Sequence, residues 1–276
     1  MARMEDWIGR ERRRVEVLAP GDLARLAAVL DRSATPLEVP PAWHWACAVE
    51  TPRQSEIGPD GHPLRGGFMP PIEAPRRMFA AAEMRFEAPL LAGLETEWIE
   101  RIASISEKAG KSGPLTFVEV ERRISQGGAL CRAETQTIVY RQPPAPGEAA
   151  PSPVAAPDDA DWRVAITPDV TLLMRFSAAT FNAHRIHYDR AYAMEVEGYP
   201  GLVVHGPLIA LSLLEAMPPG RLVTSFSFRA VRPLFDGAPF EACGKLVDDG
   251  VELWARSVEG YLAMTARVEF APSQSQ

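Results

Sequence analysis

The segment PLIALSLLEAM, residues 207–217, decides the fold of this chain. It is almost wholly apolar, and a helix made of such residues is buried on all of its sides. Pro207 suits the first position of a helix, and Gly206 suits the turn before it. Residues 207–217 therefore predict a central helix that the rest of its domain must surround.

The residues after this helix form four segments that alternate between apolar and polar side chains, which predicts four neighbouring strands. Turn residues such as Asp248, Asp249 and Gly250 separate the segments. The four segments are residues 221–230, 238–247, 251–257 and 262–270. We expect a long antiparallel meander wrapped around the helix, which is the plan of a hot-dog fold.

The first half of the chain has a similar layout. Residues 117–126 and 133–141 indicate neighbouring strands, and residues 75–84 and 89–94 carry the expected passage from helix to strand. Residues 141–162 are rich in Pro, Ala and acidic side chains, which favours an extended linker. We predict an α+β, double hot-dog fold with two antiparallel sheets, each wrapping a central helix. Its parts are an N-terminal hot-dog domain of residues 1–141, a linker of residues 142–162 and a C-terminal hot-dog domain of residues 163–276.

The composition narrows the class of protein. Hydrophobic residues make up 46% of the 276 residues and charged residues 24%, which is the balance of a folded globular protein. The net charge of −7 disfavours nucleic acid as a partner. No apolar run is long enough to cross a membrane, and the charged N-terminus lacks the apolar core of a secretory leader, so we expect a cytoplasmic protein. The three cysteines are scattered, which predicts buried free thiols rather than disulfides or a zinc site.

Residues 176–208 hold three of the five histidines of the chain, within the motifs FNAHRIHYD (181–189) and VVHGPL (203–208). These motifs resemble the signature of the MaoC-like (R)-specific enoyl-CoA hydratases. Residues 66–93 and 111–128 look like the FAS1-like dehydratase half of the two-domain members of that family. The combination is most similar to mesaconyl-C4-CoA, 3-methylfumaryl-CoA and itaconyl-CoA hydratases and to type 2 hydroxyacyl-thioester dehydratases.

The resemblance covers the chain from about Trp43 and implies a lyase of CoA thioesters that needs no cofactor and no metal. It implies that water is added to the double bond of a short, branched dicarboxylate enoyl-CoA. One position departs from the single-domain pattern. Asn182 stands five residues before His187, where that pattern has a catalytic aspartate. The two-domain relatives look like this sequence here, so the departure marks a subfamily.

Hydration of an unsaturated thioester needs a base, a group that orients water, and donors for the developing enolate oxygen. We expect His187 to be the base, because histidine accepts and donates protons near neutral pH. Asn182 cannot act as a base, and it either orients the water or forms a turn. The N–H of Gly206, at the start of the apolar helix, suits the oxyanion.

Further residues are expected around the substrate. Arg185 lies two residues from His187, so in an extended segment it would share the pocket and pair with a carboxylate; a surface ion pair is the alternative. Arg76 and Arg77 are expected to open the helix of the first half, near CoA phosphates or in solvent. We expect Tyr188 to pack beside the site and His205 to hold the 203–208 turn. Asp189 is expected either to orient a neighbouring side chain or to cap a short helix over residues 190–198.

Two other functions stay open at this point. One is a dehydratase that acts on an acyl-carrier-protein thioester in fatty-acid synthesis, although the net charge disfavours docking of an acidic carrier. The other is a non-catalytic acyl-CoA-binding subunit, against which the retention of His187 and Gly206 argues. Hot-dog folds also host thioesterases, because a fold alone does not fix a function. A homodimer is one expected assembly.

Overall fold

The computed structural model describes residues 3–110, 113–143 and 152–272. Within these residues the strands form one ten-stranded antiparallel sheet with the order β1-β3-β4-β5-β2-β7-β10-β9-β8-β6. The strands of the first half are β1 (Glu11–Val17), β2 (Arg76–Phe86), β3 (Glu95–Gly110), β4 (Gly113–Gln126) and β5 (Ala129–Arg141). Those of the second half are β6 (Trp162–Ile166), β7 (Val223–Ala230), β8 (Phe240–Val247), β9 (Gly250–Ser257) and β10 (Leu262–Phe270).

The sheet is built from two halves with the same strand order, read outward from the centre. In each half, the second strand of the chain lies innermost and the first strand lies at the outer edge. The halves join where β2 pairs with β7, with Ala82 opposite Phe228 and Met84 opposite Phe226. This duplicated topology confirms the α+β, double hot-dog fold, and it joins the two expected sheets into one.

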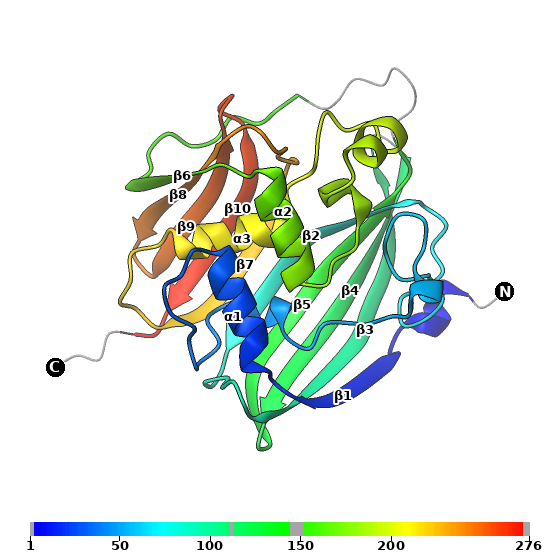
Figure 1. Ribbon diagram of the computed structural model, residues 1–276, viewed down its shortest axis with the longest axis horizontal. Helices are drawn as coiled ribbons and strands as arrows, with labels where there is room; N and C mark the ends of the chain where they lie inside the picture. Colours follow the sequence, from blue (N-terminus) through cyan, green and yellow to red (C-terminus); the bar gives the residue numbers. More distant parts are fainter. Residues whose placement is uncertain (1–2, 111–112, 144–151, 273–276) are drawn as a thin grey trace.

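The three α-helices of the described residues gather over one face of the sheet (Figure 1). They are α1 (Pro20–Val29), α2 (Val170–Ala179) and α3 (Gly206–Glu215). In α3 every residue from Leu208 to Leu213 is buried, which confirms the central helix expected from residues 207–217. The short helices are η1 (Met4–Trp7), η2 (Trp43–Ala46), η3 (Gln54–Glu56), η4 (Arg185–His187) and η5 (Tyr192–Val196).

The helix expected over residues 75–84 is wrong, because these residues form most of strand β2. Their alanines favour a helix in isolation, but the segment pairs with β5 on one side and β7 on the other. Tertiary pairing overrides such local preference. In the first half, residues 42–75 take the place in chain order that α3 has in the second, and they contain only η2 and η3.

The expected four-strand meander of the second half is correct for three strands. β8, β9 and β10 follow one another as neighbours, but β7 lies beside β10 rather than beside β8. The chain therefore crosses the half-sheet between β7 and β8. This crossing puts β7 at the centre, where it can pair with β2.

The expected linker is partly visible. Residues 144–151 lie outside the described residues, and in the part that follows, Ala156 packs on Cys243 and Trp254. The domain limits therefore stay a prediction. The three cysteines are free and buried, as expected. Among the described residues, no helix is both long and apolar enough to cross a membrane.

Candidate active site

The segment that carries the motif histidines starts at the end of α2. Phe181 turns the chain in a left-handed conformation (φ 49°), and the N–H of Asn182 then donates to the carbonyl of Ser177 over 2.8 Å. The side-chain Oδ1 of Asn182 accepts the backbone N–H of His184 over 3.0 Å. Asn182 thus forms a turn, which was one of its two expected roles, and its amide N–H groups are left to donate.

His187 is buried and fixed in one tautomer. Its Nδ1–H donates to the carbonyl of Val203 over 2.7 Å, so Nε2 carries the free lone pair. Burial lowers the pKa of His187 to about 4. The ring is therefore neutral near pH 7, with Nε2 ready to accept a hydrogen bond from water. This geometry agrees with a role as base, although that role stays a prediction.

Four histidine rings form a contact series that includes His187. His187 stacks on His205 with ring centroids 3.7 Å apart, and it meets the edge of His184 at 5.3 Å. His184 in turn contacts His62, from the N-terminal half, at 4.1 Å. Burial, together with the neighbouring rings of His62 and His187, lowers the pKa of His184 to about 2. We call His205, His187, His184 and His62 the histidine row.

His205 holds the 203–208 turn, as expected. Its Nε2 bonds the hydroxyl of Ser177 in α2 over 2.8 Å, and the side chain is fully buried. His205 is also the residue before α3, so the bond fixes the start of that helix against α2. The first residue of α3 is Gly206, and a Cβ there would stand 3.6 Å from the carbonyl oxygen of Phe79 in β2. The helix start that would supply an oxyanion donor thus lies beside β2.

His62 comes from a tight turn that docks on the motif segment. Gly61 has a φ of 91°, and a Cβ there would stand 1.8 Å from the carbonyl oxygen of Ala183. The backbone N–H of Arg185 donates to the carbonyl of Asp60 over 2.9 Å. Only glycine allows this approach, so the two halves of the chain meet at this point.

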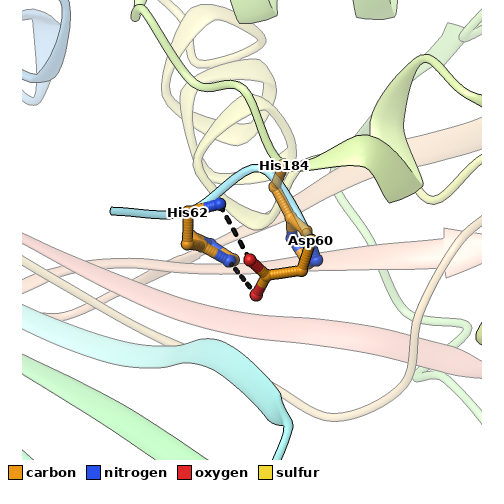
Figure 2. Close-up of side chains that lie close together, drawn as sticks. All are labelled: Asp60, His62 and His184. Atoms are coloured by element: carbon orange, nitrogen blue, oxygen red, sulfur yellow. Dashed lines mark hydrogen bonds and ion pairs between the residues drawn. The ribbon is translucent and has the colours of Figure 1, made fainter. Parts of the chain in front are cut away.

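Asp60 and His62 form a bonded pair within this turn (Figure 2). Nδ1 of His62 lies 3.0 Å from one carboxylate oxygen of Asp60, and the backbone N–H of His62 donates to the other over 3.0 Å. Although burial would raise the pKa of Asp60, the hydrogen bonds and charge of His62 lower it to about 2. Burial lowers the pKa of His62, so near neutral pH the pair is a carboxylate and a neutral imidazole.

The same three side chains lie close enough to hold a cation, which the spacing of the histidines did not reveal. The ligand-type atoms of Asp60, His62 and His184 lie within 4.8 Å of one another. However, the Nδ1–H of His62 is bonded to the Asp60 carboxylate, so a cation at Nδ1 would have to displace that proton. The expectation of no metal stays a prediction.

A cavity of about 890 Å³ lies next to the histidine row, mainly in the N-terminal half. It is lined by residues of the 44–77 segment, by residues of strands β1, β3, β4 and β5, and by Thr180, Tyr192 and Glu197 of the second half. Asp60 and His62 are among its lining residues, whereas His187 is not. The cavity therefore reaches the row at its His62 end. A smaller hollow of about 590 Å³ over β2, β7, β9 and β10 has no histidine in its lining.

Arg185 does not lie as expected from an extended segment. Residues 185–187 form a 3-10 helix rather than an extended segment, so the side chains of Arg185 and His187 do not point to the same face. Arg185 bonds Asp189 over 2.7 Å and the carbonyl of Pro59 over 3.0 Å, the ion pair named as the alternative. The Tyr188 hydroxyl donates to Ala183. Their contacts with a substrate stay predictions.

Arg76 and Arg77 lie on strand β2 and differ in their surroundings. Arg76 pairs with Glu197 over 3.0 Å and lies over the ring of Tyr199. Arg77 lines the cavity, and its charge lowers the pKa of both His62 and His184. Within the described residues, no hydrogen bond or ion pair holds the guanidinium of Arg77. Arg77 therefore presents an uncompensated positive charge near the histidine row.

Asp189 caps a short helix, as expected, because its Oδ1 accepts the N–H of Tyr192 over 3.1 Å.

The residues that sequence reasoning missed are Asp60 and His62. A signal existed in the PDGHP segment at 59–63, where an aspartate precedes a histidine by two residues inside a turn. The position of this segment beside His184 depends on how the two halves of the chain pack, and no local pattern in the sequence indicates that packing.

The duplicated hot-dog topology and the buried histidines at the start of α3 define the class: a double hot-dog protein of the hydratase and dehydratase kind. The chain belongs to the hydroxyacyl-thioester dehydratase type 2 family, which matches residues 42–236. It is 47% identical over 271 residues to the mesaconyl-C(4)-CoA hydratase of Chloroflexus aurantiacus, covering 95% of this chain and 96% of that protein.

Two further relatives are more distant. The mitochondrial hydroxyacyl-thioester dehydratase type 2 of Schizosaccharomyces pombe is 28% identical over 264 residues, covering 85% of each chain. A MaoC-like dehydratase from Phytophthora capsici has the same fold, with a TM-score of 0.72, 13% identity and 99% of both chains covered.

Proposed function

We propose that this protein is a hydratase that adds water to the double bond of a short, branched dicarboxylate enoyl-CoA, of the mesaconyl-C4-CoA, 3-methylfumaryl-CoA or itaconyl-CoA type. One observation carries the proposal. His187 keeps a free Nε2 in a buried site beside the start of α3, and the chain as a whole is 47% identical to a mesaconyl-C(4)-CoA hydratase. We further propose that it works in the cytosol, without a cofactor or metal, and as a homodimer.

The site offers each group that hydration requires. Nε2 of His187 accepts a hydrogen bond from the attacking water and so orients and polarises it. The amide N–H groups of Asn182 donate to the water or the substrate, since its Oδ1 is already bonded to the His184 N–H. The N–H groups at the start of α3 meet the thioester oxygen as it gains enolate charge, because a helix N-terminus favours negative charge.

The dicarboxylate substrate is supported by the charge near the site. A free carboxylate on the acyl chain needs a cation, and Arg77 lines the cavity next to the histidine row with no ion-pair partner among the described residues. A guanidinium suits a carboxylate because both are planar and can form paired hydrogen bonds. Arg185 remains a second candidate for this contact.

A dehydratase of fatty-acid synthesis is the second candidate function. The family itself and the 28% identical yeast relative favour it, since both are named for dehydration of hydroxyacyl thioesters. The cavity of about 890 Å³ also has room for a longer acyl chain. The two functions share their chemistry and differ in the substrate.

One experiment separates these functions. The purified protein is incubated with mesaconyl-, itaconyl-, crotonyl- and longer enoyl-CoA thioesters, and mass spectrometry detects the gain of one water. The proposal predicts the highest kcat/KM for a dicarboxylate thioester. A preference for long neutral chains would place the fatty-acid dehydratase first, and binding without any gain of water would indicate a non-catalytic subunit.

A further inference from the structure

The motif segment lacks a free carboxylate. Asn182 stands where the resemblance places an aspartate, and a carboxamide does not take up a proton. Asp189 is the other acidic position in that motif, but it bonds the Arg185 guanidinium and the Tyr192 N–H. Hydration nevertheless needs a group that carries a proton between water and the α-carbon. Any acid–base group beyond the histidines of this segment therefore comes from another part of the chain.

We propose that Asp60 and His62 form a catalytic dyad, in which His62 carries the proton and Asp60 holds the ring and balances its charge. The proposal deepens the proposed hydratase function and rests on it. It places a reacting group of the site on the N-terminal half.

The hydrogen bonds of His62 leave the right atom free. Its Nδ1–H donates to Asp60 over 3.0 Å, so the neutral ring keeps its lone pair on Nε2. Among the described residues, no group donates a hydrogen bond to that Nε2. His62 also lines the cavity of about 890 Å³, so a ligand in the cavity can reach the ring. His62 thus has the orientation and the access that a base requires.

The turn that carries the dyad is fixed against the motif segment by three contacts. Gly61 lies against the carbonyl of Ala183, and Arg185 donates from its backbone to Asp60 and from its guanidinium to Pro59. The ring of His62 is thereby held 4.1 Å from that of His184, which itself contacts His187 at 5.3 Å. A catalytic group must be held in place to this degree, and a mobile surface turn would not do so.

The dyad is better suited than His187 to carry a full positive charge. The Nδ1 partner of His187 is the carbonyl of Val203, which has only a partial charge. The Nδ1 partner of His62 is an ionised carboxylate, which stabilises an imidazolium as it forms. We therefore assign His187 to holding and polarising the water, and His62 to taking its proton.

The step balances within the site. Nε2 of His62 removes one proton from the water, and the water oxygen forms a bond to the β-carbon. The electron pair of the double bond moves to the α-carbon and thioester, giving an enolate. The His62 imidazolium then returns the same proton to the α-carbon. H and OH have been added across the double bond, and the dyad is neutral imidazole and carboxylate again.

The test compares His62→Ala and Asp60→Asn with wild type and with Glu87→Gln. The control removes a carboxylate from the same half of the chain, where Glu87 is exposed, bonds Arg85 over 3.1 Å and is not part of the cavity lining. We expect His62→Ala to lower kcat by ~10²–10⁴-fold. Asp60→Asn should lower it by about 10- to 100-fold, the effect of losing one charge-assisted hydrogen bond. Glu87→Gln should stay near wild type.

Rescue with imidazole distinguishes a catalytic role of His62 from a purely structural one. Added imidazole should restore part of the kcat of His62→Ala, because it can carry the proton in the space left by the ring, and it should not change the kcat of Glu87→Gln. If His62→Ala does not fold, kcat and KM are measured for His62→Gln and Asp60→Asn instead. Near-normal kcat in folded His62 variants overturns the dyad. Loss of wild-type turnover on chelation, restored by a divalent cation, overturns it in favour of a metal site.

Failure of the dyad and failure of the function give different results. If wild type hydrates an enoyl-CoA while the His62 variants remain active, only the dyad is wrong. If wild type hydrates none of the thioesters, the proposed function has failed before the dyad is tested.

Discussion

The ring of His187 stacks on the ring of His205 with centroids 3.7 Å apart and planes 19° apart. Both rings are buried, and burial lowers the pKa of each below its ordinary value of 6.5, to about 4 for His187. Two imidazolium ions cannot share this space without a large cost in charge repulsion and lost hydration. The stack is therefore stable only while the rings are neutral.

Acid should weaken the fold in a window set by these histidines. In the unfolded chain the histidines take up protons near pH 6.5, whereas in the folded chain His187 does so only near 4. The unfolded state thus binds more protons in between, and stability falls as the pH drops through that window. Melting followed by circular dichroism should give a Tm several degrees lower at pH ~5 than at pH ~7. An equal or higher Tm at the lower pH would contradict this.

A second loss of stability should begin only in stronger acid. Glu100 and Glu134 are buried beside Arg122, which outweighs the effect of burial and lowers both pKa values to about 2. Their contribution is fully present above the unfolded value of 4.5 and is lost as the pH falls towards 2. Unfolding free energies from urea titrations at several pH values would show whether the two losses are separate.

Gly61→Ala should damage both the fold and the activity. The new Cβ would stand 1.8 Å from the Ala183 carbonyl, so the turn must move away from the motif segment. We expect a cost of about 1–3 kcal/mol in unfolding free energy and a clear fall in kcat. Gly66→Ala is the matched control, because Gly66 has the same φ of 91° but nothing within 4 Å of its Cβ position. Equal effects of the two substitutions would mean that the contact with Ala183 does not matter.

Asn182 should tolerate one substitution and not the other. In Asn182→Asp, an oxygen can still accept the His184 N–H and hold the turn, so we expect turnover to be retained. Asn182→Ala loses that bond and the orienting amide, and roughly a 10-fold fall in kcat is expected. Steady-state rates with a saturating substrate measure both. Complete loss in both variants would instead show that the amide N–H groups are essential.

The two arginine candidates for the substrate carboxylate predict different results. Arg77→Met should lower kcat/KM for a dicarboxylate thioester by about 10- to 100-fold and leave crotonyl-CoA nearly unchanged, since crotonyl-CoA has no distal charge. Arg185→Met should affect both substrates, because Arg185 ties the turn at Pro59 to the motif segment. If Arg185→Met alone removed the preference, the original prediction for Arg185 would be correct.

The sequence allowed prediction of those parts of the fold whose signals are local. The apolar run at 207–217 and the alternation in β4, β5, β8, β9 and β10 indicate their structures without help from the rest of the chain. The alanines of β2 favour a helix, and only the pairing with β5 and β7 makes this segment a strand. The expected site around His187 and His205 follows from one continuous segment.

The other part of the site could not be predicted because it depends on how the halves pack. Asp60 and His62 lie far from His184 in the sequence, and the glycine between them gives no sign of the carbonyl that it contacts. The expected position of Arg185 relative to His187 is wrong because it requires an extended segment, whereas residues 185–187 form a 3-10 helix.

The central claim is that buried histidines of this chain hydrate an enoyl-CoA, and the most direct measurement is the kcat of His187→Ala beside wild type. A mesaconyl- or itaconyl-type thioester serves as the substrate, and melting curves establish that the variant is folded. The account predicts a loss of ~10²–10⁴-fold in kcat, because removing Nε2 leaves the attacking water without its acceptor. Near-normal turnover by the folded variant would contradict it.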